Sequence, residues 1–108
     1  MAIQPTQPVK PKSVRQLFSD PARWIKRDSS KIKKIKGKEV LCFCMTGAID
    51  HIYPYPNPKN AIARKRVKAA IELYELGKFD PDKGIEGWND QTKRNITDVQ
   101  RVVAIAKI

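Results

Sequence analysis

The longest apolar run of the chain, Val40–Ile52, constrains the fold most, because charged residues and prolines interrupt the rest of the sequence. Read with the period of a helix, this run gives one continuous apolar stripe with spacings of 4, 3 and 4 residues. The stripe consists of Leu41, Met45, Ala48 and Ile52. An alternation of period two fits less well. We therefore expect a helix here and an all-α fold around it.

The two cysteines of the chain lie in this run, and their chemistry depends on its period. On a strand, Cys42 and Cys44 would share a face and could bind a metal together. On the expected helix they point about 200° apart, because each residue advances by roughly 100°. Gly37 can begin that helix, and Tyr53, which stands before Pro54, closes it. The sequence therefore predicts neither a shared metal ion nor a disulfide.

One face of the expected helix carries small residues. Cys44, Gly47 and Ala48 lie on it, and such a face allows another element to approach closely. The indole of Trp24 is our candidate for that element. The single histidine, His51, is on the same side as Cys44, but seven residues of helix separate them by roughly 10 Å. That distance excludes a hydrogen-bonded catalytic pair.

The rest of the chain predicts one small domain. Residues 1–12 carry three prolines at a spacing of three and form an expected extended arm, which a partner can order. Residues 13–108 are expected to form a bundle of four to five short helices, with a basic loop at 29–38. No apolar run approaches the roughly 20 residues of a membrane span, and no secretion signal is seen, so we expect a cytoplasmic protein that contacts no membrane.

Positive charge is concentrated in the first two-thirds of the chain. The whole sequence has 22 basic and 11 acidic residues, a net charge of +11. Residues 1–76 hold 16 of the bases and 6 of the acids, net +10. Such asymmetry predicts binding to a polyanion. The candidate contacts are the lysines of the basic loop and the start of a long helix: Lys31, Lys33, Lys34, Lys36, Lys38, Arg64, Lys65 and Lys68.

The long helix follows a proline-rich connector. Asn57 caps it and Pro58 begins it, and Gly77 ends it after Leu76. Tyr53 and Tyr55 lie in the connector, where they are candidate aromatic contacts for a base or a partner, although tyrosines beside prolines more often cover a core.

The C-terminal third contains a Trp-Asn-Asp turn and a last helix. Trp88 is the expected core anchor, and Asn89 and Asp90 are expected to bond backbone amides in the polar turn that leads to the helix. Thr97 and Gln100 have the spacing of a capping box. The expected buried face of the helix is Val99, Val102, Val103 and Ala106.

These features together resemble a family of small bacterial and phage proteins that is known only as a domain of unknown function. The resemblance extends from Trp24 to the C-terminus. It is carried by Trp24, Asp28, Cys44-x-x-Gly47-Ala48, the long helix, Trp88-Asn89-Asp90 and the helix with Thr97 and Val99. It implies a small helical domain without an established activity. The lysine-rich stretch after Asp28 and the proline arm depart from the family pattern.

Three functional hypotheses follow. The first is a non-enzymatic module that grips nucleic-acid phosphates through the basic loop and the start of the long helix. The second is an accessory protein of a phage or bacterium that docks on an acidic protein surface. The third is an enzyme that uses Asn89, Asp90 and His51. Because no phosphate-cradling loop, metal-spaced cluster or acid-base pair is found, the sequence predicts no enzyme, no metal and no cofactor.

Overall fold

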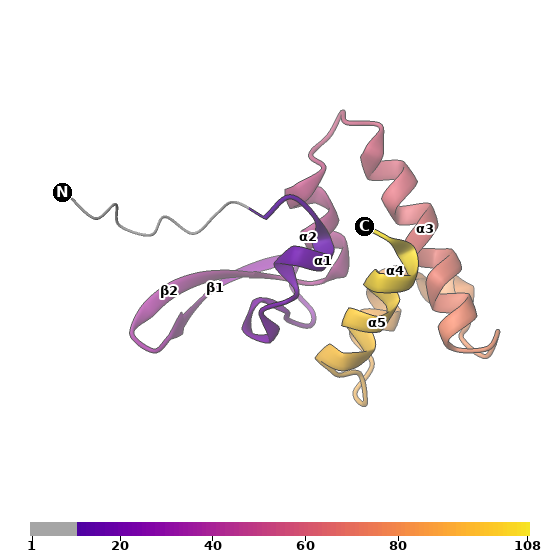
Figure 1. The fold of residues 1–108 in the computed structure, drawn as a ribbon. Coiled ribbons are helices and arrows are strands. Elements are labelled where there is room, and N and C mark those ends of the chain that lie inside the picture. Colours follow the sequence, from indigo (N-terminus) through magenta and orange to yellow (C-terminus); the bar gives the residue numbers. More distant parts are fainter. Residues whose placement is uncertain (1–10) are drawn as a thin grey trace.

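The computed structural model describes residues 11–108 (Figure 1), so most of the expected arm 1–12 lies outside the described residues. A β-hairpin accompanies the helices, so the prediction of an all-α fold is wrong and the domain is mixed α+β. The elements are α1 (Val14–Leu17), η1 (Pro21–Arg23), β1 (Ser30–Ile35), β2 (Lys38–Phe43), α2 (Met45–Ile52), α3 (Lys59–Tyr74), η2 (Pro81–Lys83), α4 (Gly84–Asn89) and α5 (Ile96–Ala106).

The basic stretch 29–38, expected as a loop, forms the first strand and the turn of the hairpin. Lys36 and Gly37 join the strands, and both have positive φ, 51° and 79°. A two-residue turn with two positive φ angles matches the right-handed twist of paired strands. Gly37 therefore begins no helix. β1 pairs antiparallel with β2 over six residue pairs, from Ser30 with Phe43 to Ile35 with Lys38.

Only the second half of the long apolar run is helical. α2 begins after Cys44, whose sulfur accepts a hydrogen bond from the Gly47 amide at 3.4 Å, and it ends before Tyr53 as expected. The predicted apolar stripe, with spacings of 4, 3 and 4 residues, therefore began at Leu41, which lies on a strand and not on the helix. Cys42 and Phe43 are buried where β2 meets the helices.

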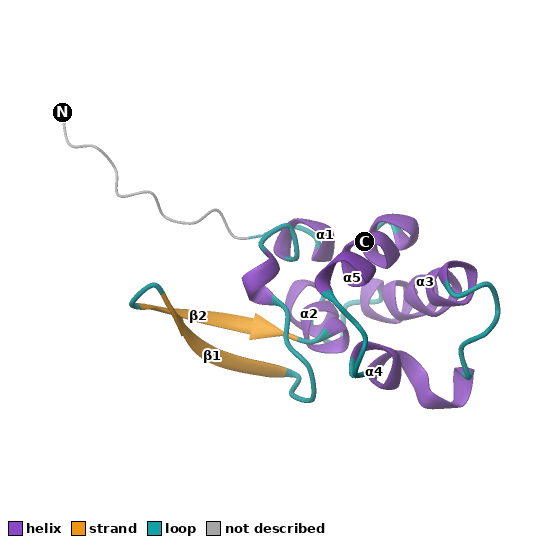
Figure 2. Ribbon diagram, turned by 90° about the horizontal axis from the view of Figure 1, so that it is seen from below, coloured by secondary structure: helices purple, strands orange, loops and turns teal. Residues whose placement is uncertain are grey.

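The core lies among the helices, at one end of the molecule. Figure 2 shows the helices gathered on one side and the hairpin projecting from them as a free ribbon. α3 packs along α5, and the expected buried face of α5 is confirmed. The largest buried side chain is Trp88, which confirms its role as the core anchor. Other core residues include Val14, Leu17, Phe18, Met45, Ile49, Val67, Val99, Val102 and Val103.

An arginine whose side chain is 7% exposed, Arg94, connects α3, α4 and α5 around Trp88. The guanidinium of Arg94 lies 3.9 Å from the Trp88 ring centre and donates to Glu75 at 2.9 Å. The Trp88 indole N–H donates to the same carboxylate at 2.9 Å. Arg94 also lies 3.6 Å from Asp98, which accepts a hydrogen bond of 2.6 Å from the hydroxyl of Tyr74. Loss of one member of such a network leaves the remaining polar groups only partly satisfied.

The N-terminus of α5 differs by two residues from the expected capping box. Asn95 accepts from the Asp98 amide at 3.0 Å, and Asp98 accepts from the Asn95 amide at 3.2 Å. Thr97 and Gln100 have no part in this box. The side chain of Gln100 instead donates to the carbonyl of Phe18 at 2.8 Å.

The Asp98 network predicts a specific loss of stability in acid. Burial alone would raise the pKa of Asp98, but hydrogen bonds from Tyr74 and Asn95, with the charge of Arg94, hold it below its ordinary value. A carboxyl whose pKa is lowered by folding stabilises the fold above its unfolded pKa of about 4, and this contribution is lost as the pH falls through the folded pKa.

Replacing Tyr74 by Phe removes one of these hydrogen bonds. We expect a loss of about 1–2 kcal/mol in the free energy of unfolding at neutral pH, and acid unfolding at a higher pH than in the parent protein. Urea titrations at a series of pH values measure both. Tyr55→Phe is the control, because the Tyr55 side chain is 69% exposed. Identical acid limbs for Tyr74→Phe and the parent protein would contradict the assigned role of this bond.

Candidate nucleic-acid interface

The five lysines of the predicted basic loop lie on the projecting hairpin, and all are exposed. The strand register fixes their faces, because residues directly opposite each other share a face. Lys31, Lys33 and Lys38 lie on one face together with Ile35 and Val40. No acidic residue of the two strands shares this face. Lys36 lies in the turn at the tip.

The other face of the hairpin is less basic. Lys34 lies opposite Glu39, so its charge is partly balanced. Next to this pair, Ile32 lies opposite Leu41, and these side chains are 62% and 37% exposed. The two faces therefore differ: all charged residues of the first are basic, and the second carries one charge pair and an exposed apolar pair.

The second predicted basic cluster, on α3, lies away from the hairpin in both views (Figures 1 and 2). Arg64 is engaged within the fold: it binds Asp50 at 2.7 Å and the side chain of Asn60 at 3.0 Å. Burial alone would lower the pKa of Arg64, but the hydrogen bond and charge of Asp50 outweigh it and raise the pKa. Lys65 and Lys68 are exposed. The structure thus does not join the two predicted clusters into one surface.

The base of the hairpin is held on both faces and along one edge. The Arg23 side chain donates to the Leu41 carbonyl at 2.8 Å, and the Ile25 amide donates to the Phe43 carbonyl at 3.0 Å. On one face the Cys42 thiol donates to the Ala22 carbonyl at 3.1 Å. On the other face the Phe43 ring stacks on His51 of α2, with ring centres 4.5 Å apart. The ribbon is therefore fixed where it leaves the body.

Asn89, fully buried, connects three segments at this base. Its side-chain oxygen accepts from the indole of Trp24 at 2.6 Å and from the amide of Met45 at 3.1 Å. Its side-chain nitrogen donates to the Ile25 carbonyl at 3.0 Å and to Asp90 at 2.9 Å.

The Asp90 carboxylate also accepts a hydrogen bond of 2.8 Å from the Arg27 amide. Backbone bonding by Asn89 and Asp90 is thus observed. However, the partners lie more than 40 residues away in the chain, and not in the adjacent turn as expected.

Close approach at Gly47 occurs as predicted, but the approaching group is different. A Cβ built on Gly47 would lie 1.7 Å from the carbonyl oxygen of Ser29, closer than any non-bonded contact allows. The same oxygen accepts from the Cys44 amide at 3.3 Å. The backbone just before β1, and not the ring of Trp24, therefore requires glycine here. Trp24 belongs to the same region through its bond to Asn89.

The thiols and the tyrosines have separate surroundings. Burial raises the pKa of the Cys42 thiol, although Lys33 and Arg23 act in the opposite direction. Both cysteines are free and buried.

The Tyr53 hydroxyl donates to the carbonyl of Ile108 at 3.3 Å, so Tyr53 covers the core, whereas Tyr55 is exposed.

Within residues 11–108 no group of three or more His, Cys, Asp and Glu side chains could hold a metal ion. The two hollows described in this part of the chain are lined by none of His51, Cys44, Asn89 and Asp90.

Sequence reasoning missed Arg23, whose side chain lies along the edge of β2, and it missed the hairpin itself. The signal for the hairpin was present. Two runs of six residues that contain Ile32, Ile35 and Val40 flank a two-residue turn with glycine in second position.

No protein-family model matches the chain, and comparisons with curated proteins and with solved structures found no match either. The resemblance to a small bacterial and phage family therefore stays an expectation. None of the helices in residues 11–108 combines the length and the apolar character that a bilayer crossing requires.

The contact at Gly47 gives a second testable prediction. Gly47→Ala places a methyl group on the Ser29 carbonyl, so the hairpin base must move. We expect a loss of about 3 kcal/mol in the free energy of unfolding, at the upper end of the usual cost of overpacking. We also expect faster reaction of the buried thiols with a thiol reagent in the native protein.

Gly77→Ala is the matched control. Gly77 has a φ of +74° and open space around a Cβ, so this variant should lose about 1–2 kcal/mol through backbone strain without exposing the thiols. Equal thiol reactivity in the two variants would show that Gly47 does not hold the hairpin base.

Proposed function

We propose that this chain binds nucleic acid without catalysing a reaction on it, and that the projecting hairpin lies along the phosphates of a duplex. The observation that carries the proposal is the display of Lys31, Lys33, Lys34, Lys36 and Lys38 on one ribbon that leaves the helical body (Figure 2). A two-stranded ribbon has the width that the major groove of B-form DNA admits. No helix of residues 11–108 covers the projecting part of this ribbon (Figure 2).

The type of residue supports phosphate binding more than base reading. An ammonium group is a point charge with rotatable donors, and it lacks the planar fork with which arginine recognises guanine. Each of the five cations on the hairpin is a lysine. We therefore expect binding that depends strongly on salt and weakly on sequence.

The fixed base of the hairpin also supports the proposal. The hydrogen bonds of Arg23, Ile25 and Asn89 orient the ribbon before any ligand is bound. A preorganised ribbon loses less conformational entropy on binding than a flexible basic loop. The lysine side chains themselves lie outside the core, so charge and stability can be changed separately.

The test is the replacement of Lys33, Lys34 and Lys36 by Ala. We expect weaker binding to a DNA duplex, a nearly unchanged melting temperature, and a flatter plot of log K against log salt. The slope should change by about 0.9 for each phosphate that the variant no longer neutralises. Fluorescence anisotropy of one labelled duplex at several salt concentrations measures affinity and slope together.

The matched control replaces Lys78, Lys83 and Lys93 by Ala. These lysines are exposed and lie outside the hairpin, and their replacement removes the same amount of charge. Equal loss of affinity in both triple variants would mean that net charge alone, and not the hairpin, attracts the duplex. Undetectable binding of the parent protein at low salt would overturn the proposal.

The competing hypothesis, docking on an acidic protein, has its own readout. A pull-down from nuclease-treated lysate should lose the captured material if nucleic acid is the ligand. A stoichiometric acidic protein that survives the nuclease, and that the hairpin triple variant no longer retains, would replace nucleic acid as the partner.

A further inference from the structure

We infer that the hairpin contacts nucleic acid with one face only, and that this face takes a double strand in preference to a single strand. The inference rests on the proposed function and deepens it, because it separates the lysines that touch phosphates from the one that does not. The contacting face, called the lysine face below, carries Lys31, Lys33 and Lys38. Lys34 lies on the opposite face, and Lys36 lies in the turn and belongs to neither.

The three lysines of the lysine face form a row. Lys31 and Lys33 are two strand residues apart, which is about 7 Å. Lys38 lies diagonally across the strand pair from Lys33, at about 7–8 Å, because Lys33 is paired with Val40. The apolar residues of this face, Ile35 and Val40, are half-buried, and lysine stems can lie over such residues with their ammonium groups in water. Cations spaced in this way can each meet a different phosphate.

The opposite face is unsuited to a phosphate backbone. Glu39 is paired with Lys34, with their Cβ atoms about 5 Å apart, so its carboxylate offsets the lysine and repels phosphates. Beside this pair, Ile32 and Leu41 expose apolar side chains. Phosphate oxygens are bound by N–H and O–H donors, and apolar groups placed against them would remove water without replacing its hydrogen bonds. This face therefore stays in water when the duplex is bound.

At the base of the hairpin, the lysine face continues onto a further cation. The Cys42 thiol, which is on this face, donates to the Ala22 carbonyl of η1 at 3.1 Å, and Arg23 is the next residue of that element. Burial raises the pKa of the thiol, whereas Lys33 and Arg23 lower it, so both cations lie near the sulfur. Asp20 acts against them, with the smallest of these effects. Arg23 thus extends the positive charge of the lysine face toward the body.

The hairpin offers no exposed ring on which a base could stack. Its one aromatic residue, Phe43, is 3% exposed and stacks on His51 of α2. Proteins that hold single strands combine cations with aromatic rings that stack on successive bases. A duplex needs no such ring, because its bases are stacked within the helix and its phosphates lie outside. Cations without rings therefore favour a double strand.

The test compares two neighbouring lysines that remove the same charge from opposite faces. In fluorescence anisotropy with one labelled DNA duplex, Lys33→Gln should weaken binding about fivefold at about 0.1 M salt and flatten the plot of log K against log salt by about 0.9. Lys31→Gln and Lys38→Gln should behave in the same way. Lys34→Gln is the matched control and should leave both affinity and slope close to those of the parent protein. All four lysines are exposed, so melting temperatures should not change.

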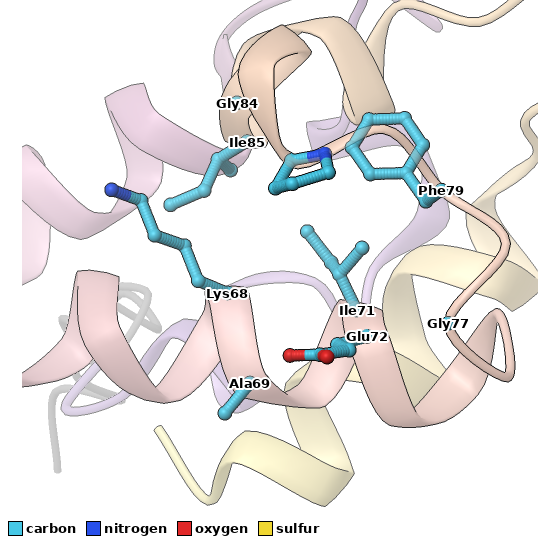
Figure 3. A pocket seen from close by; sticks show the side chains of 9 residues that line it. Lys68, Ala69, Ile71, Glu72, Gly77, Phe79, Gly84 and Ile85 are labelled. Atoms are coloured by element: carbon cyan, nitrogen blue, oxygen red, sulfur yellow. The ribbon is translucent and has the colours of Figure 1, made fainter.

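Removal of an acid from the opposite face gives an independent readout. Glu39→Gln should strengthen binding no more than Glu72→Gln does. Glu72 is exposed on α3, where it lines the hollow shown in Figure 3, so its replacement changes the net charge equally but away from the hairpin. A clearly larger gain from Glu39→Gln overturns the assignment of the face. So do equal losses from Lys33→Gln and Lys34→Gln.

Unlabelled DNA tests the preference for a double strand. At equal phosphate concentration, a single strand of the same length should displace the labelled duplex several-fold less well than the unlabelled duplex does. A single strand that competes equally well or better overturns this preference. Undetectable binding of the parent protein to the duplex would end the proposed function itself, whereas binding that is indifferent to the face of the lysine ends only this inference.

Discussion

The buried amide of Asn89 is the interaction on which the rest of the structure depends. Its four hydrogen bonds reach Trp24, Ile25, Met45 and Asp90, and so join the segment before the hairpin, the start of α2 and the end of α4. A neutral side-chain amide, with one acceptor oxygen and two N–H donors, can satisfy this whole set. An apolar replacement would take this partner away from the Met45 amide, the Ile25 carbonyl and the Trp24 indole N–H.

The residues that stabilise the fold and the exposed lysines lie in different parts of the molecule. Within residues 11–108, aromatic rings, aliphatic packing and the Arg94 side chain hold the shape of the helical body, and the hairpin meets this body at the end near Phe43. Beyond that end the ribbon carries mostly polar side chains that contribute little to the core. A chain of this size can thus present a dense group of cations without placing them where their desolvation would weaken the fold.

Sequence reasoning located the buried α5 face, the Trp88 anchor and the end of α2, because each depends on local periodicity or on a residue before proline. It did not predict the hairpin at residues 30–43, where the apolar run favours a helix and the lysines hide the alternation of a strand. The apolar residues at the end of β2, Cys42 and Phe43, are followed directly by the apolar residues of α2. The helical periodicity therefore continues across the boundary between the strand and the helix. The lysines of β1 mask its alternation, because both faces of a free ribbon meet water. No local sequence pattern could predict the groups that Asn89 and Gly47 contact, because these groups lie far away along the chain. Gly47 signals a close approach, but the approaching Ser29 carbonyl is placed by strand pairing, which spacing along the chain does not encode.

The exposed ribbon has a further consequence for the behaviour of the chain at high concentration. Within residues 11–108 no other strand pairs with β1, so one edge of the ribbon presents backbone amides and carbonyls without a strand partner beside the apolar Ile32. Such an edge is a template for fibril growth, and lysines along it oppose the stacking of identical chains by mutual repulsion. We therefore expect the lysines of the hairpin to oppose edge-to-edge association of identical chains.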